Sequence, residues 1–144
     1  MITLLQRVSE ARVGVGGETI AQIERGILIF VGVQAEDDEP TAQSFIDRLL
    51  NYRIFADAEG KMNRSLIDIE GGLLLVPQFT LAANTRKGRR PSFTSAASPQ
   101  HGNRIFDFMV DYARAAYDRV ACGRFGADMQ VHLVNDGPVT FILE

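Results

Sequence analysis

The chain has 144 residues, 46% of them hydrophobic and 23% charged, which favours an ordinary apolar core and excludes a disordered chain. A net charge of −3 excludes a general nucleic-acid coat, because phosphate neutralisation needs dense lysine and arginine. Cys122 is the single cysteine, so no intramolecular disulfide forms. We expect a cytoplasmic protein without a membrane segment, since the longest apolar run, residues 26–33, is too short to span a bilayer.

The first third of the chain predicts a β-meander. Residues 2–8 are rich in β-formers, residues 11–15 alternate, and Gly16-Gly17 then interrupts the pattern as a hairpin turn would. Residues 19–23 form another short alternating segment. Residues 27–33 are apolar at almost every position, which is typical of a strand that is buried on both faces.

Two later segments carry helix signals. Asp37-Asp38-Glu39-Pro40 places acids and a proline where a helix begins, and apolar residues then recur at helical spacing over residues 45–50. Ser98-Pro99 is a capping residue followed by a first-turn proline, and residues 105–116 carry an apolar stripe. The sequence therefore predicts two main helices.

Between the two helices, residues 53–55 predict a short strand, and Gly71-Gly72 opens a further strand over residues 73–76. This second strand runs directly into Pro77-Gln78-Phe79-Thr80-Leu81. The polar and basic segment from residue 82 to 98 is too long for a simple turn, and such loops are usually functional.

The end of the chain predicts a hairpin. Residues 129–134 and 139–143 are β-rich, and Asn135-Asp136-Gly137-Pro138 lies between them with strong turn chemistry. The expected architecture is mixed α/β, a curved, mostly antiparallel and barrel-like sheet with two main helices packed against it.

Several common chemistries lack their motifs. No dinucleotide or phosphate-binding glycine pattern occurs between a strand and a helix, and the spacing of His101, Cys122 and His132 does not suit zinc. We therefore expect no cofactor and no metal. A Ser-His-Asp triad is disfavoured because His132 lies in mid-strand and His101 lies in the first turn of a helix, where we expect it to be solvated.

Three features have both a structural and a functional interpretation. Gln78 and Thr80 follow a buried strand, where they either satisfy loop backbone or bind a substrate carbonyl. Gly137-Pro138 is either ordinary turn chemistry or, with a cis bond, a device that aims two carbonyls. The basic run of Arg86, Lys87, Arg89 and Arg90 is either a solvated loop or a contact for an RNA backbone.

Taken together, two segments resemble the signature motifs of the bacterial-type D-aminoacyl-tRNA deacylases, Ser-Gln-Phe-Thr-Leu and Asn-x-Gly-Pro-Val-Thr. Here they stand as Pro77-Gln78-Phe79-Thr80-Leu81 and Asn135-Asp136-Gly137-Pro138-Val139-Thr140. The resemblance continues in chain order through residues 6–8, 52–55, 57–63, 90–93 and 123–129. Pro77 departs from the family's serine and removes both a hydroxyl and a backbone donor.

The resemblance implies that residues 1–144 form one homodimeric deacylase domain. Members hydrolyse the ester between a D-amino acid and the terminal ribose of tRNA, and they also remove glycine from mischarged alanine tRNA. Catalysis is then assigned to Gln78, Phe79 and Thr80. Gly137 and Pro138 of one subunit would enter the partner's active site, where their carbonyls grip the α-amino group and crowd an L side chain.

Further roles carried over from the family are supporting ones. Arg7 would brace Gly137-Pro138, and Phe125 and Met129 would line the adenosine side. The four cations between residues 86 and 90 would contact the tRNA. For the attack itself, either Thr80 is the nucleophile or the free ribose hydroxyl assists water, and we favour the second because no histidine base accompanies Thr80.

Two other classes of function stay open from the sequence. One is a non-enzymatic RNA-binding module, which the acidic balance of the chain disfavours. The other is a small-molecule amidase or esterase that uses Thr80 as nucleophile and needs no tRNA. Hydrolysis of D-tyrosyl-tRNA, L-tyrosyl-tRNA and a free D-tyrosine ester separates the three.

Overall fold

The computed structural model describes residues 1–144 and begins with three antiparallel strands. These are β1 (Ile2–Val15), β2 (Glu18–Ile23) and β3 (Gly26–Gly32). The predicted meander is confirmed, and Gly16 and Gly17 turn the chain with φ of 57° and 82°, a region that glycine adopts without a Cβ clash. The two β-rich stretches before this turn form one continuous strand, because β1 has partners along its whole length.

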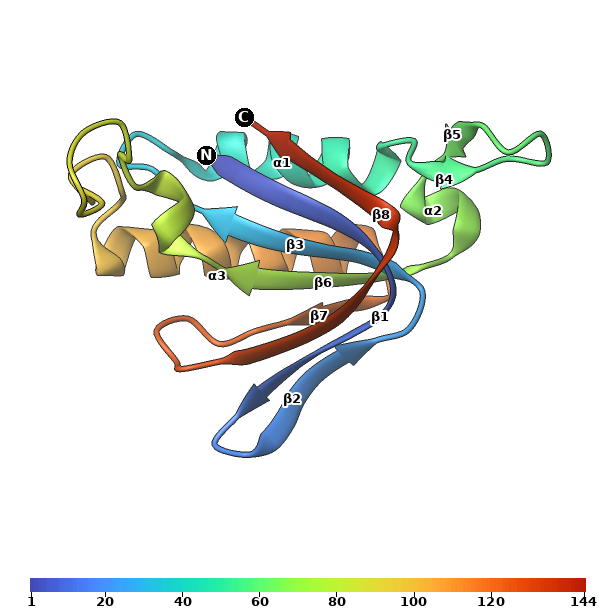
Figure 1. Cartoon of the computed structure of the whole chain (residues 1–144), viewed down its shortest axis with the longest axis horizontal. Helices are drawn as coiled ribbons and strands as arrows, with labels where there is room; N and C mark the ends of the chain where they lie inside the picture. The colour runs from blue at the N-terminus through green and yellow to red at the C-terminus, as the bar shows by residue number, and fades with distance from the viewer.

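β1 is the centre of the sheet. Its first half pairs with β3, its second half with β2, and its other edge pairs with the C-terminal strand β8 (Gln130–Leu143). On the far side of β3 lie β6 (Gly72–Pro77) and β7 (Val120–Cys122), both parallel to their neighbours. The sheet bends strongly along β1 and β8 (Figure 1), so the mostly antiparallel, curved and barrel-like architecture is confirmed.

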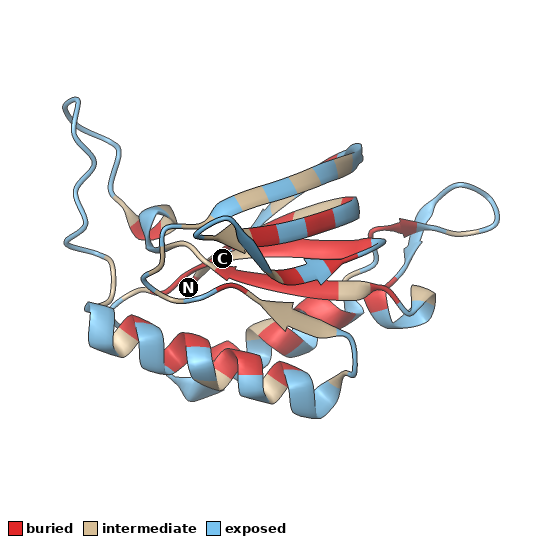
Figure 2. Ribbon diagram, turned by 90° about the horizontal axis from the view of Figure 1, so that it is seen from below, coloured by how far each residue is buried: buried red, intermediate tan, exposed pale blue.

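Two long helices cover one face of the sheet, as Figure 2 shows. They are α1 (Glu39–Asn51) and α3 (Pro99–Ala116), and both begin where predicted. Asp38 caps α1 by accepting the Thr41 N–H at 2.9 Å, and Ser98 caps α3 by accepting the His101 N–H at 3.2 Å. These caps satisfy backbone donors that have no partner inside a helix.

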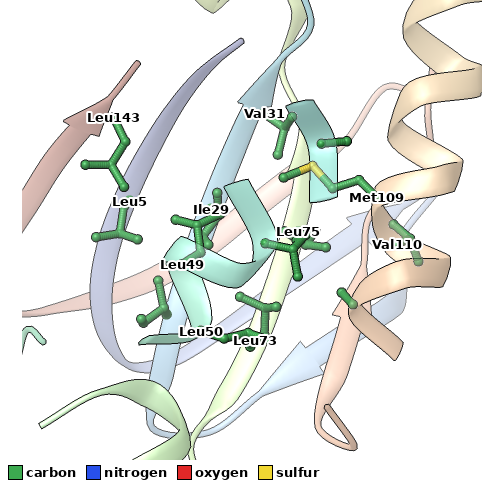
Figure 3. Close-up of a cluster of buried hydrophobic side chains, with 14 of the residues drawn as sticks. Leu5, Ile29, Val31, Leu49, Leu50, Leu73, Leu75, Met109, Val110 and Leu143 are labelled. Carbon is green, nitrogen blue, oxygen red and sulfur yellow. The ribbon is translucent and has the colours of Figure 1, made fainter. Parts of the chain in front are cut away.

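The main core lies between this helix layer and the sheet. Leu49 and Leu50 of α1 and Met109 and Val110 of α3 point toward the strands in Figure 3. They meet alternate residues of β1, β3, β6 and β8, namely Leu5, Ile29, Val31, Leu73, Leu75 and Leu143. A smaller cluster occupies the opposite, concave face and includes Leu28, Leu74 and Val76. Both faces of β3 and β6 are therefore buried, which explains their continuous apolar runs.

The predicted C-terminal hairpin is wrong. Residues 130–143 form one strand that pairs antiparallel with β1 on both sides of Asn135-Asp136-Gly137-Pro138. Gln6 pairs with Thr140 and Val8 with Asn135, so residues 136–139 bulge opposite the single residue Arg7. The residues with turn chemistry therefore form a bulge within one strand and do not connect two strands.

Smaller elements complete the fold. β4 (Phe55–Ala56) and β5 (Met62–Arg64) form a short hairpin, and α2 (Leu66–Ile69) follows it. The predicted strand at residues 53–55 is thus shifted to Phe55–Ala56, and the expected Glu59-Gly60 turn is present, with Gly60 at φ 79°. The hairpin lies at the opposite end of the molecule from the loop that precedes α3 (Figure 1).

Candidate active site

The site is built at the C-terminal end of β6. Gln78 continues the ladder by donating its N–H to the Val31 carbonyl at 2.8 Å, and the chain then tightens into the 3-10 turn η1 (Phe79–Ala82). Gly32 allows this turn to pack against β3, because a Cβ there would lie 2.8 Å from Leu81 Cβ and 3.2 Å from the Gln78 carbonyl. The turn thus places polar groups directly on the edge of a rigid sheet.

Gln78 and Thr80 lie side by side at this edge. The Gln78 amide donates to Thr80 Oγ1 at 2.5 Å, and Thr80 is exposed whereas Gln78 is half-buried. The N–H groups of Phe79 and Thr80 begin the 3-10 turn, where no internal carbonyl accepts them. The strand end therefore presents a side-chain amide, a hydroxyl and two backbone donors in one place.

An apolar pocket of about 420 Å³ adjoins these donors. Its volume lies within the range of small-molecule sites, about 300–1,000 Å³. The walls come from the ends of β3 and β6, the first half of α3 and the loop between β7 and β8. Its lining includes Gln78, Phe79, Phe125, Asp128 and Met129.

Glycines allow the walls of this pocket to approach closely. A Cβ on Gly102 of α3 would lie 3.2 Å from the Phe125 ring, and a Cβ on Gly123 would lie 2.9 Å from Met129 Sδ and 3.3 Å from Pro77 Cδ. Phe125 also packs against Phe106, with ring centroids 6.4 Å apart. Met129 and Phe125 are therefore held in fixed positions over the strand ends.

The Gly137–Pro138 peptide bond is cis, and Gly137 has φ 138°, a conformation that side chains rarely adopt. Arg7 holds the bulge from the opposite strand. Its Nε donates to the Asp136 carbonyl at 3.0 Å, and its Nη1 donates to the Ile54 carbonyl at 2.8 Å. Within one chain Arg7 therefore contacts this segment through Asp136, and it also ties the bulge to the start of β4.

Asn135 and Thr140 close the bulge from within, a role that was not predicted from the sequence. Asn135 Oδ1 accepts the Val139 N–H at 2.7 Å, and its amide donates to Thr140 Oγ1 at 2.9 Å. Gln6 donates to the same hydroxyl at 3.3 Å. The first and last residues of the motif, Asn135 and Thr140, therefore clamp the base of the bulge. The sequence signal that could have suggested this clamp is an Asn five residues before a Thr, with Gly-Pro between them.

Within one chain, the two motifs lie far apart. Arg7 pairs with Ile27 of β3, whereas Pro77 pairs with Val31 of the same strand. The bulge and the β6 end are separated by four residues along a strand and by three strand spacings across the sheet. At about 3.3 Å per residue and about 4.8 Å per strand, this places them about 20 Å apart. No residue of the bulge lines the apolar pocket.

The basic run is fully exposed on a loop beside η1. Asn84 and Ser92 form an antiparallel bridge with backbone hydrogen bonds of 2.7 and 3.0 Å, so residues 85–91 project as a closed tip. Arg86, Lys87, Arg89 and Arg90 all lie on this tip, which Figure 2 shows standing clear of the body of the molecule.

Neither histidine contacts Thr80. His132 lies near the start of β8, exposed and opposite Arg12 of β1. His101 is half-buried rather than solvated, since its Nε2 lies 2.7 Å from the Asp37 carbonyl. The hydroxyl of Thr80 has Gln78 as its side-chain partner.

The sequence matches known proteins along its whole length. Residues 4–144 match the family described as D-Tyr-tRNA(Tyr) deacylase. The chain belongs to this family. Membership makes the protein an enzyme, a deacylase that hydrolyses esters. Among curated relatives, a D-aminoacyl-tRNA deacylase of Pseudomonas aeruginosa strain LESB58 is 65% identical over 144 residues, covering 100% of this chain and 99% of the relative. The corresponding protein of Stutzerimonas stutzeri is 62% identical over 141 residues, covering 98% and 97%.

Solved structures share the fold. A structure titled c-Myc DNA Unwinding Element Binding Protein superposes with a TM-score of 0.95 at 38% identity, covering 100% of this chain and 98% of that one. A probable eukaryotic D-amino acid tRNA deacylase superposes with a TM-score of 0.86 at 19% identity, covering 99% and 97%, which speaks for the fold alone. None of the helices of this family member has the length and apolar character needed to cross a bilayer.

Proposed function

We propose that this deacylase hydrolyses the ester that joins a D-amino acid to the terminal ribose of tRNA, and so serves translation quality control in the cytoplasm, where aminoacyl-tRNA is used. The observation that carries the proposal is the apolar pocket beside the donors of Gln78, Phe79 and Thr80. The pocket suits the terminal nucleoside, and the donors suit the ester carbonyl at its edge. Glycine mischarged on alanine tRNA is then also a substrate, because glycine has no side chain that the site could reject.

The nucleoside would lie against Phe125 and Met129. An aromatic ring and a thioether give a base an apolar, polarisable surface to stack on, and the glycine contacts at Gly102 and Gly123 keep both side chains in place. Asp128, which also lines the pocket, offers a carboxylate to ribose hydroxyls. The ester then points toward Gln78.

Stereochemical selection is assigned to Gly137 and Pro138 of a second copy. Since the bulge lies about 20 Å from its own chain's β6 end, it cannot reach the same ester within one chain. In the proposed two-fold dimer, the bulge of each subunit would enter the site at the strand end of the other. Main-chain carbonyls there would bind the α-amino group and leave no room for an L side chain.

Catalysis would rest on positioning and on hydrogen bonds to the developing oxyanion. A backbone N–H from Phe79 or Thr80, or the Gln78 amide, can polarise the carbonyl, and one such donor contributes about 3–4 kcal/mol to lowering a barrier. No side chain that could take a proton from Thr80 contacts its hydroxyl, so we assign the activation of water to the free ribose hydroxyl of the substrate.

Pro77 is compatible with this site. The ladder toward β3 does not use its nitrogen, because Gln78 donates to Val31 and the neighbouring loop donates from Gly123 to the Leu75 carbonyl at 2.8 Å. Proline in place of the family's serine therefore leaves the strand end in register. The Pro77 ring packs beside Gly123 in the wall of the pocket.

A three-substrate assay tests the proposal. We expect hydrolysis of D-tyrosyl-tRNA, none of L-tyrosyl-tRNA, and weak hydrolysis of a free D-tyrosine ester. Equal cleavage of the tRNA-bound and free D-esters would make the protein a small-molecule esterase. Binding of tRNA without any cleavage would make it an RNA-binding module and would overturn the assignment.

A further inference from the structure

Two phenylalanine rings lie exposed at the rim of the apolar pocket. The exposed fraction is 56% for Phe79 and 42% for Phe93, and their ring centroids are 5.2 Å apart with an interplanar angle of 52°. None of the other large hydrophobic side chains that are similarly exposed is aromatic. Since burying a phenyl ring is favourable, a solvent-facing aromatic pair indicates a surface that receives a ligand.

Both rings are held in place by the fold. Phe79 is the first residue of η1 and lines the pocket, so its backbone is set by the β6 ladder. Phe93 directly follows the Asn84–Ser92 bridge on the returning arm of the basic loop. Below it, Ser95 Oγ donates to the Ala82 carbonyl at 2.6 Å, which ties this arm to the end of η1. The pair is therefore a built surface between the pocket and the basic tip.

The surroundings of the pair are strongly positive. Residues 78–98 contain four arginines and lysines and no aspartate or glutamate. Since the whole chain carries −3 and this segment +4, the remaining residues carry −7. A polyanion is therefore drawn to this one part of an otherwise acidic surface.

The loop leads from the pocket, past the aromatic pair, to the basic tip. A single strand of nucleic acid offers a matching series: a terminal base for the pocket, a preceding base for the aromatic pair, and phosphates for the tip. We propose that Phe79 and Phe93 form a stacking platform for the unpaired nucleotide that precedes the terminal nucleoside of tRNA, an inference that rests on the proposed function. Aromatic faces stack with any base, so this contact adds affinity without reading sequence. The basic tip then faces the phosphates that lead toward the acceptor stem.

Kinetics on two substrates tests the platform. Phe93→Ala should raise KM for D-tyrosyl-tRNA by roughly five- to a hundredfold, the range expected for removing one base stack, with little change in kcat. It should leave kcat/KM for the D-tyrosyl ester of adenosine alone unchanged, because that substrate lacks the preceding nucleotide. Phe93→Tyr should restore KM. Met62→Ala is the matched control, since Met62 is similarly exposed, at 49%, on β5 at the other end of the molecule.

Several outcomes would overturn the platform. An equal loss of kcat/KM on both substrates would place Phe93 in the pocket or in the fold, and no loss on either would remove it from the site. A change in oligomeric state, measured by light scattering, would show that a second subunit covers the rings. If the wild type cleaves neither substrate, the proposed function fails by itself, and the platform is then judged by whether Phe93→Ala weakens binding of uncharged tRNA.

Discussion

At the scale of single residues, Thr80 decides between two mechanisms. Its hydroxyl accepts a hydrogen bond from Gln78 and has no base beside it. We therefore expect Thr80→Val, which keeps the branched shape, to hydrolyse D-tyrosyl-tRNA at close to the wild-type kcat. A D-tyrosyl-tRNA whose terminal ribose lacks the free hydroxyl should instead be a very poor substrate. A decrease in kcat of about a thousandfold or more in Thr80→Val would identify threonine as a covalent nucleophile.

Gly137 is the second decisive residue. Alanine there would place its Cβ 2.7 Å from Val139 Cγ2 and 3.1 Å from the Arg7 guanidinium, in a backbone region that disfavours side chains. We expect Gly137→Ala to displace the bulge and to lower kcat/KM for D-tyrosyl-tRNA by at least about tenfold, the effect of a small misplacement at a site.

Gly60→Ala provides the matched control for that substitution. Gly60 also has positive φ, at 79°, but it lies on the β4–β5 turn with no atom near its would-be Cβ. This variant should lower the thermal midpoint while leaving kcat/KM unchanged. If both variants had equally reduced activity, backbone strain alone would explain the effect of Gly137→Ala.

At the scale of elements, three carboxylates stabilise local structure and should give the fold an acid limit. The Thr41 hydroxyl, and then its N–H, lower the pKa of Asp38 at the start of α1. Backbone N–H groups likewise lower the pKa of Asp57 in the β4–β5 turn, chiefly that of Lys61, and of Asp68 in α2, chiefly that of Ser65. A carboxylate with a lowered pKa contributes stability above its ordinary pKa of 3.8, and this stability disappears as pH falls through the lowered value.

Asp38→Ala should therefore lower the thermal midpoint at pH 7, because α1 is then without its cap. The difference from wild type should begin to shrink below pH 3.8, where Asp38 of the unfolded wild-type chain becomes protonated, and should be smallest below the lowered pKa of the folded carboxylate. Circular dichroism melts between pH 7 and pH 2 measure this. A difference that stays constant over the whole range would show that the charge of Asp38 has no part in capping.

The basic loop makes its own prediction. Reversing Arg89 and Arg90 to Glu should weaken tRNA binding and flatten its dependence on salt, by about one unit of slope for each phosphate that is no longer neutralised. Lys61→Glu, on the exposed β4–β5 hairpin at the other end, serves as the control. Binding isotherms at several salt concentrations measure the slope, and an unchanged slope would exclude the loop from the tRNA-binding surface.

At the scale of the whole molecule, the proposed sharing of each active site between two subunits should allow two variants with low activity to rescue each other. A heterodimer of Gln78→Ala and Gly137→Ala has one site with both defects and one site with none. Random pairing makes half of the dimers mixed, so co-refolded subunits should recover about a quarter of wild-type activity. Activity no greater than that of the two variants alone would place both motifs in the same subunit.

Much of this fold can be predicted from local signals. The two long helices are predictable because Asp38 and Ser98 cap them and prolines follow, all within a few residues. The three residues of β7 are too few to show a period, and its pairing with β6 depends on distant backbone. The hairpin predicted at the C-terminus is wrong because Asn-Asp-Gly-Pro has turn chemistry in either setting, and only β1, more than a hundred residues away, makes it a bulge.

The candidate site is predictable as residue types rather than as geometry. Gln78 and Thr80 stand out in the sequence because they end a buried strand, and the structure places them in contact. The clamp made by Asn135 and Thr140 and the pairing of Phe79 with Phe93 depend on chain reversals that no local pattern records. The distance between the two motifs within one chain also depends on the sheet. It is about 20 Å, given about 3.3 Å per residue and about 4.8 Å per strand.

The long pairing of β8 with β1 has a consequence for how the enzyme matures. It joins positions as distant as Thr3 and Leu143, and contacts between such remote segments are slow to form because the intervening loop must first be closed. The Gly137-Pro138 bulge exists only inside that pairing, whereas Gln78 needs just the parallel ladder between β3 and β6. We therefore expect the bulge, to which chiral discrimination is assigned, to form late in folding, after the groups assigned to hydrolysis can already be in place.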